Sequence, residues 1–188
     1  ETAKKAILAG KHVYCEKPLA GTYAQAKELA ELAREKSVKA QIVFNNRFLS
    51  AVISARELVC EGKIGNILSF NARYVHSSAT DVNKNAGWKQ NKDVCGGGVL
   101  FDLGSHAIDL IYYLFGEFKS VVVKSQIAYP TRRGMDGGEW QTNADEAFYM
   151  LATLKNGAYG TIEVSKIAVG SNDDLFSCTL TATDVNFI

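Results

Sequence analysis

The feature that most constrains this chain is residues 96–116, "GGGVLFDLGSHAIDLIYYLFG", an apolar run that carries a line of polar side chains. Its apolar residues would cover most of a helix: Val99, Leu100, Leu103, Ala107, Ile108, Leu110, Ile111, Leu114 and Phe115. Asp102, His106, Asp109 and Tyr113 recur at helical spacing, so they form one narrow polar stripe. We predict a largely buried helix with one polar face.

Two explanations of this stripe follow from its chemistry. Asp102 and His106 can form a satisfied buried pair, in which the carboxylate fixes the imidazole. Alternatively, the stripe is the wall of a cavity, where substrate and water supply the partners. Burying several ionisable groups is costly unless each is paired. The stripe alone leaves both explanations open.

Other chemistries fit this run less well. Two ligands, Asp and His, are too few for a metal, and neither His12 nor His76 has a ligand partner at useful spacing, so we predict no metal site. "GSH" does not match the G-x-S-x-G nucleophile elbow. Phe101 stands where a G-x-G-x-x-G fingerprint needs its last glycine. We expect the glycines of residues 96–98 to let the loop pass close to a ligand or a neighbouring backbone.

The composition is that of an ordinary soluble protein. Of 188 residues, 47% are apolar and 22% charged, and the net charge of +1 gives no electrostatic case for nucleic acid or an anionic membrane. No run of roughly 18 apolar residues predicts a membrane span. The four cysteines stand far apart without a CxxC pair, so we expect free thiols and a cytoplasmic protein.

Residues 1–47 alternate short helices and strands. A helix closes at Gly10, the strand in "HVYCEKP" stops at Pro18, and Thr22 can cap a helix over residues 23–36 before the strand in "AQIVFNNRF". This rhythm is typical of a parallel α/β sheet, of which only the end is present. Lys17 follows a strand of that sheet, where ligands bind in open α/β folds, although the tetrapeptide "CEKP" alone also fits a solvated lysine.

Residues 48–188 have a different pattern. A helix over residues 49–60 ends near Gly62, and the strand after it places Leu68, Phe70, Ala72 and Tyr74 on one face. Strand-like runs follow at 119–129, 145–157 and 158–169. The last two join at Asn156-Gly157, a tight-turn signal. Thr161, Glu163 and Ser165 suggest one solvated face. We therefore predict an α+β domain with a mostly antiparallel, open-faced sheet and helices on one face.

Two connections are long, at about residues 77–98 and 130–143. Unstructured connections of this length are uncommon in compact domains and often line a site. Mobile surface loops explain the length equally well.

Four segments together resemble the glucose-fructose oxidoreductase/inositol dehydrogenase/MocA family: "GKHVYCEKPLA", "FNNRF", "EGKIGNI" and the run at 96–116. Their order and spacing match over roughly residues 1–167. The combination of E-K-P with a later G-G-G-x-x-x-D-x-G-x-H-x-x-D is specific, whereas each half alone is weak.

The resemblance implies hydride transfer between NAD or NADP and a sugar, polyol or related hydroxy compound. It assigns Lys17, Asp102 and His106 as catalytic, with His106 as general acid/base and a cis peptide at Lys17-Pro18. It also implies that Glu16, Lys17, Pro18 and Arg47 contact the cofactor. Candidate substrate-binding residues are Arg73, Trp88, Lys89, Asp102 and His106.

Two departures from the family pattern stand out. The G-x-G-x-x-G turn and the first Rossmann strands are missing, so residues 1–47 resemble the last part of a dinucleotide-binding domain. The stretch "LFSCTLTATDVNFI" lacks the glycine turn that the family has near its position. We therefore expect an N-terminally truncated fragment, truncated or frameshifted at its C-terminus too, that is inactive alone.

Two alternatives remain at this stage. One is an NAD-using glycosidase of the same superfamily, and the other is a non-enzymatic oligomerisation or binding module. An open sheet face favours a homo-oligomer, whereas nucleic acid and membrane are not expected partners.

Overall fold

The computed structural model describes residues 1–171 and 176–184. It divides the chain into two compact units, Glu1–Asn45 and Asn46–Ile188, close to the expected boundary at residue 47. Each unit has its own hydrophobic core, so each is described separately.

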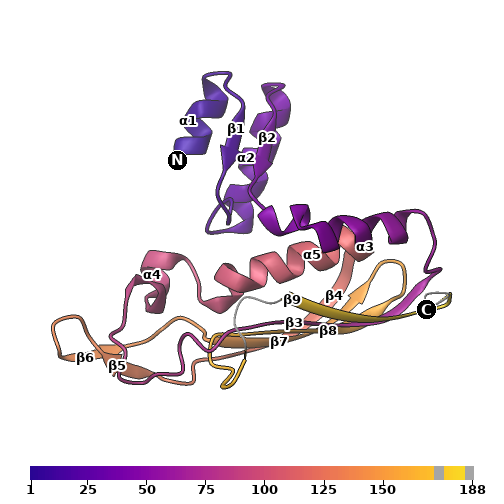
Figure 1. The fold of residues 1–188 in the computed structure, drawn as a ribbon. Coiled ribbons are helices and arrows are strands. Elements are labelled where there is room, and N and C mark those ends of the chain that lie inside the picture. The colour runs from indigo at the N-terminus through magenta and orange to yellow at the C-terminus, as the bar shows by residue number, and fades with distance from the viewer. Residues whose placement is uncertain (172–175, 185–188) are drawn as a thin grey trace. The chain divides into compact units, whose positions relative to one another are not determined.

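The first unit is a two-stranded parallel sheet with two helices (Figure 1). Strands β1 (Val13–Cys15) and β2 (Ala40–Ile42) pair in parallel beside helices α1 (Thr2–Leu8) and α2 (Tyr23–Glu35). The Thr22 hydroxyl accepts a hydrogen bond from the Gln25 N–H at 3.3 Å and so caps α2. The Lys17-Pro18 peptide is cis, as the resemblance implies. Ile7, Leu29 and Ala33 form the small core.

The second unit is built on a five-stranded sheet in the order β4-β7-β8-β3-β9. The strands are β3 (Ile67–Val75), β4 (Phe118–Gln126), β7 (Ala147–Leu154), β8 (Tyr159–Ser165) and β9 (Phe176–Ala182). The pair β3–β8 is parallel and the other three pairs are antiparallel, so the mostly antiparallel sheet is confirmed.

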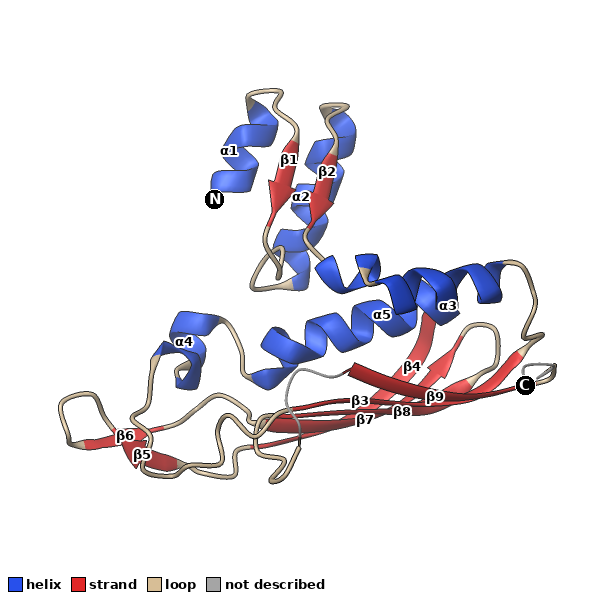
Figure 2. Ribbon diagram, in the orientation of Figure 1, coloured by secondary structure: helices blue, strands red, loops and turns tan. Residues whose placement is uncertain are grey.

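Helices α3 (Ser50–Cys60) and α5 (Ser105–Phe115) cover one face of this sheet (Figure 2). Helix α5 contributes Ala107, Leu110, Ile111, Leu114 and Phe115 to a core shared with β3, β7 and β8. The run Lys92–Phe115 has the length and composition of a membrane span. Its apolar side packs on the sheet, however, which is the arrangement of a core helix in a soluble domain.

Two predictions of side-chain direction are wrong. Leu68 is 48% exposed. The register of β3 against β9 shifts between Ile67 and Ser69, and this irregularity breaks the expected alternation at the start of β3. Ser165 is only 3% exposed, and its hydroxyl accepts a hydrogen bond from the Ile167 N–H at 3.0 Å at the end of β8.

The two long connections are folded rather than structureless. The first contains the short helices η2 (Trp88–Gln90) and α4 (Lys92–Cys95), and the second contains a hairpin of β5 (Thr131–Arg133) and β6 (Glu139–Gln141). They are joined by hydrogen bonds from Ala86 N to Arg133 O at 2.7 Å and from Lys92 N to Asn143 Oδ1 at 2.6 Å. The connections therefore form one substructure at one end of the sheet.

Candidate functional site

The start of the central helical run is fixed by Asp145, which lies just before β7. Its carboxylate accepts hydrogen bonds from the N–H groups of Gly98 at 3.1 Å and Leu100 at 2.9 Å. A Cβ on Gly98 would lie 2.2 Å from the Asp145 carbonyl oxygen. Gly98 therefore allows a close backbone approach, and the carboxylate satisfies N–H groups at the helix start.

Asp102 lies in a π-helical turn, η3 (Leu100–Gly104), directly before α5. Such turns are rare and are often found at functional sites. The Ser105 hydroxyl donates to the Asp102 carbonyl at 3.2 Å. A Cβ on Gly104 would lie 2.5 Å from the Phe148 ring, so this glycine lets the turn pack tightly on β7.

The Asp102 carboxylate binds two lysines from distant parts of the chain. Lys89 Nζ, from η2, lies 2.9 Å from Asp102 Oδ2, and Lys166 Nζ, just after β8, lies 2.8 Å from the same oxygen. Lys89 was expected here but Lys166 was not, because no motif marks it. Exposure of the side chains is 48% for Lys89, 25% for Asp102 and 15% for Lys166. The two ammonium groups stabilise the charged form of the carboxylate.

His106 follows Asp102 in the first turn of α5 and is half-buried. An imidazole can accept or donate a proton near neutral pH, and nearby cations can stabilise negative charge on an oxygen. Asp102, His106, Lys89 and Lys166 thus combine groups for proton transfer with groups that bind oxygen.

A cavity of about 290 Å³ lies beside these lysines. Its walls include Ser78, Lys84, Trp88, Lys89, Gln90 and Lys166. Two of the five expected substrate-binding residues, Trp88 and Lys89, line this cavity. Among the described residues, no group of three or more His, Cys, Asp or Glu side chains could hold a metal ion.

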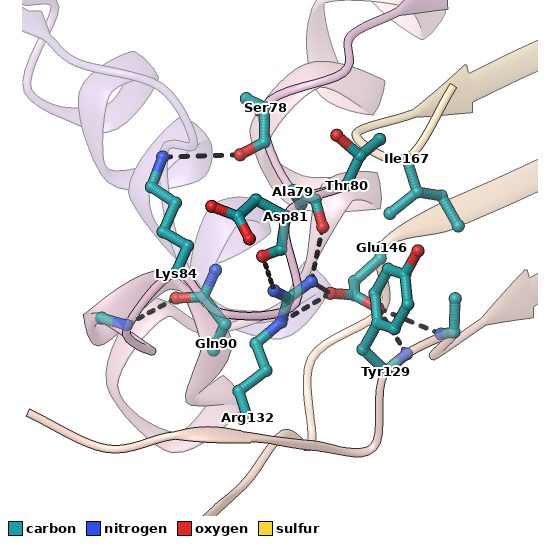
Figure 3. Close-up of polar contacts among 12 residues, drawn as sticks. Ser78, Ala79, Thr80, Asp81, Lys84, Gln90, Tyr129, Arg132, Glu146 and Ile167 are labelled. Carbon is teal, nitrogen blue, oxygen red and sulfur yellow. Dashed lines mark hydrogen bonds and ion pairs between the residues drawn. The ribbon is translucent and has the colours of Figure 1, made fainter. Parts of the chain in front are cut away.

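In the wall of this cavity, a buried ion pair that the sequence does not predict connects the loops (Figure 3). Arg132 and Glu146, with side chains 2% and 5% exposed, form the pair. Arg132 also donates to the carbonyls of Ala79 at 2.6 Å and Asp81 at 3.0 Å, and Glu146 accepts from the Tyr129 N–H at 2.9 Å. Both charges have several partners, so the pair fixes the cavity wall.

The second half of the polar stripe has a different environment. The Asp109 side chain is 8% exposed and binds Arg47 through Nε at 2.8 Å and Nη2 at 2.5 Å. The guanidinium groups of Arg47 and Arg56 lie 4.8 Å and 5.2 Å from the centre of the Tyr113 ring. The hydrogen bond to Asp109 raises the pKa of Arg47, although burial opposes this. Arg47, expected at the cofactor, is therefore engaged in fastening the segment before α3 to α5.

Arg73 does not join the Asp102 cluster. On β3, Phe70 and Ala72 face the core, so Arg73 points from the opposite face of the sheet and binds Glu163 at 2.7 Å. Strand alternation thus contradicts the expectation that Arg73 lines the same pocket. In the first unit, Glu16, Lys17 and Pro18 follow the carboxyl end of β1, whose parallel partner is β2.

Comparison with known proteins gives two family matches along the chain. Residues 1–44 match the description "Oxidoreductase family, NAD-binding Rossmann fold", and residues 52–184 match "GFO/IDH/MocA C-terminal domain". The fold and its matches define a class, the oxidoreductases with a Rossmann-type domain. The chain belongs to the Gfo/Idh/MocA family within that class.

Individual relatives agree with this assignment. Levoglucosan dehydrogenase of Pseudarthrobacter phenanthrenivorans is 34% identical over 186 residues, which are 92% of this chain and 48% of the relative. Glucose-6-phosphate 3-dehydrogenase of Bacillus subtilis is 32% identical over 170 residues, 90% of this chain and 48% of the relative. A structure of levoglucosan dehydrogenase in complex with NADH superposes with a TM-score of 0.91, 32% identity and coverage of 97% and 48% of the two chains.

The chain spans about half the length of these relatives. The family match continues to residue 184, beyond the expected limit at 167, and β9 pairs along β3. The stretch over residues 176–184 is therefore part of the family fold, although it lacks the expected glycine turn. The expectation of a frameshift is therefore wrong for residues 176–184.

Proposed function

We propose that this chain is part of an oxidoreductase that transfers a hydride between NAD or NADP and a hydroxyl-bearing carbon of a sugar or polyol. The observation that carries the proposal is the Asp102 carboxylate, held by Lys89 and Lys166 beside a cavity, one helical turn before His106. Relatives named as sugar dehydrogenases, and a neighbour solved with NADH, support the same chemistry.

Each residue has a chemical role in this proposal. His106 takes the substrate hydroxyl proton as the hydride leaves the carbon, and returns it in the reverse direction. Lys17 orients the reacting oxygen and stabilises negative charge on it. Asp102 receives a second substrate hydroxyl and keeps the two lysines in place. The nicotinamide supplies the hydride chemistry when bound, and Glu16, Lys17 and Pro18 at the end of β1 would hold it.

A second part of the proposal is a homo-oligomer, which the open sheet face supports, in the cytoplasm, where the four free cysteines would stay reduced. This face exposes Val122 at 72%, Tyr159 at 61% and Leu151 at 55%. Apolar patches of this kind on a sheet favour self-association. The mass of the protein in solution tests it: a monomer at all concentrations, with the sheet intact by circular dichroism, argues against the interface.

The activity test replaces the matched segment of levoglucosan dehydrogenase with residues 1–184 of this chain. We expect this grafted enzyme to form NADH or NADPH from a panel of sugars and inositols, whereas residues 1–188 alone form none, because their sequence holds no dinucleotide fingerprint. His106→Asn and Lys17→Met should each lower the rate by about 10²–10⁴-fold.

The matched control is Lys124→Met, an exposed lysine of β4 that should leave the rate unchanged. A folded graft whose activity survives His106→Asn would overturn the proposed mechanism. Sugar release without NADH accumulation would assign the chain to the NAD-using glycosidases instead.

A further inference from the structure

A second cavity, of about 410 Å³, lies between helix α4 with its preceding turn and the β5–β6 hairpin. Its walls include Trp88, Asn91, Val94, Met135, Asp136 and Trp140. Its volume is within the usual range of small-molecule sites. The hydride-transfer proposal makes no use of it.

The apolar side chains around this cavity are unusually exposed. Met135 is 79% exposed, Val94 64%, Trp88 63% and Trp140 37%. A cluster of exposed apolar side chains that includes two indoles is unfavourable in water and marks a binding surface. An occupant with a flat apolar face would cover it.

The walls of this cavity are held in place before any ligand arrives. The β5–β6 register puts Arg132 opposite Trp140, and Arg132 is fixed by its buried ion pair with Glu146. On the other wall, Asn143 N donates to Gln90 O at 3.3 Å, and the Gln90 side chain accepts from the Gly87 N–H at 2.8 Å. Preorganised walls lower the entropy cost of binding.

The chemistry of the walls suits a sugar ring. A pyranose has an apolar C–H face and a polar rim of hydroxyls. The indoles of Trp88 and Trp140 offer flat apolar surfaces, and the side chains of Asn91 and Asp136 offer hydrogen-bonding groups. A few polar groups in a mainly apolar cavity are the usual composition of a specific ligand site.

The second cavity adjoins the first through shared residues. Gly87 and Trp88 line both, and the first cavity carries Lys89 and Lys166, which bind Asp102. A ligand with two linked rings can therefore occupy both cavities at once. We propose that the second cavity is a subsite for the second sugar ring of a disaccharide-type substrate, whose first ring lies beside Asp102.

This inference rests on the proposed function, because it takes the first cavity as the place of the reacting ring. The sequence contains two tryptophans, and both line the second cavity, so their indole N–H resonances report directly on it. The test titrates residues 1–188, labelled with ¹⁵N, with glucose and with cellobiose. Glucose should shift the Trp88 resonance alone, whereas cellobiose should shift both and bind about two- to tenfold more tightly.

Two variants examine the assignment. Trp140→Ala should abolish the preference for cellobiose and leave glucose affinity unchanged. Met135→Ser, at an exposed position that folding does not need, should reduce the preference. The matched control is Tyr149→Ala, an aromatic that is 50% exposed on the open sheet face, which should retain the full preference.

The outcomes separate the two proposals. If glucose and cellobiose bind equally and shift Trp88 alone, the subsite is overturned and the proposed function stands. If cellobiose retains its advantage in both Trp140→Ala and Met135→Ser, the subsite is also overturned. If neither sugar shifts either indole of the folded chain, the subsite is overturned, and the proposed function is judged separately by the activity of the grafted enzyme.

Discussion

The two ends of the polar stripe have the same helical spacing but different surroundings. Asp102, in the π-helical turn, shares one carboxylate oxygen between two lysines and lies near a cavity. Asp109, two turns further along, is 8% exposed and receives a two-point contact from Arg47. One end resembles a binding site, and the other is a structural ion pair.

The partners explain this difference. A guanidinium binds a carboxylate through two parallel hydrogen bonds, so the Arg47–Asp109 pair leaves little capacity for a ligand. An ammonium is a point donor with rotatable protons, and Lys89 and Lys166 can exchange protein contacts for substrate oxygens. The helical run thus contains a buried ion pair at Asp109 and a carboxylate near a cavity at Asp102, whereas the sequence explanation of a buried pair concerned Asp102 and His106.

The largest effect should come from removing the ionisable group of His106, close to the Asp102 end of the stripe. In the grafted enzyme, His106→Asn should lower the rate by about 10²–10⁴-fold, because no group remains to take the hydroxyl proton. Its free energy of unfolding should change by less than about 1 kcal/mol. Initial rates and urea unfolding measure the two effects. If the variant keeps its rate but loses stability, His106 has a structural role, like the Arg47–Asp109 pair.

The second contrast concerns Arg47. Arg47→Met leaves the Asp109 carboxylate without its main partner, so residues 1–188 should lose about 2–3 kcal/mol of unfolding free energy. Lys89→Met, at a 48% exposed position, should cost less than about 1 kcal/mol. Urea unfolding followed by circular dichroism measures both. Equal losses would show that Asp109 and Asp102 are held in the same way.

Local signals in the sequence predicted much of this fold. Thr22, Gly62 and Asn156-Gly157 mark helix and turn boundaries through their own side chain or backbone, so these elements were found where expected. The hairpin β5–β6 was missed, because strands of only three residues show no alternation long enough to detect.

The partners of Asp102 and Asp109 depend on tertiary register, which the sequence does not show. Lys166 reaches Asp102 across 64 residues because β8 ends beside the π-helical turn. The resemblance assigned Arg47 to the cofactor, and the sequence did not show that the packing of α5 also places Asp109 against it. The one available signal for Lys166 was a cation directly after a buried strand, which is common on any surface.

A smaller contrast lies between the two lysines on Asp102. Lys166 is 15% exposed and Lys89 is 48% exposed, so solvent screens the Lys166 contact less. Lys166→Met should lower the rate of the grafted enzyme about 10–100-fold, and Lys89→Met at most about fivefold. Initial rates at saturating cofactor measure this. A larger loss for Lys89→Met would mean that its contact with substrate outweighs its hold on Asp102.

The smallest effect is expected at Arg56, at the structural end. Its guanidinium lies 5.2 Å from the Tyr113 ring centre and donates to the Leu114 carbonyl at 3.3 Å. Arg56→Met keeps the aliphatic packing and removes the charge, so it should cost about 0.5–1 kcal/mol of unfolding free energy and leave the rate of the grafted enzyme unchanged. In a Tyr113→Leu background the same change should cost less, because the ring is gone. Urea unfolding of the parent chain, the two single variants and the double variant measures the coupling energy between Arg56 and Tyr113. A coupling energy of zero would show that Arg56 does not stabilise the Tyr113 ring.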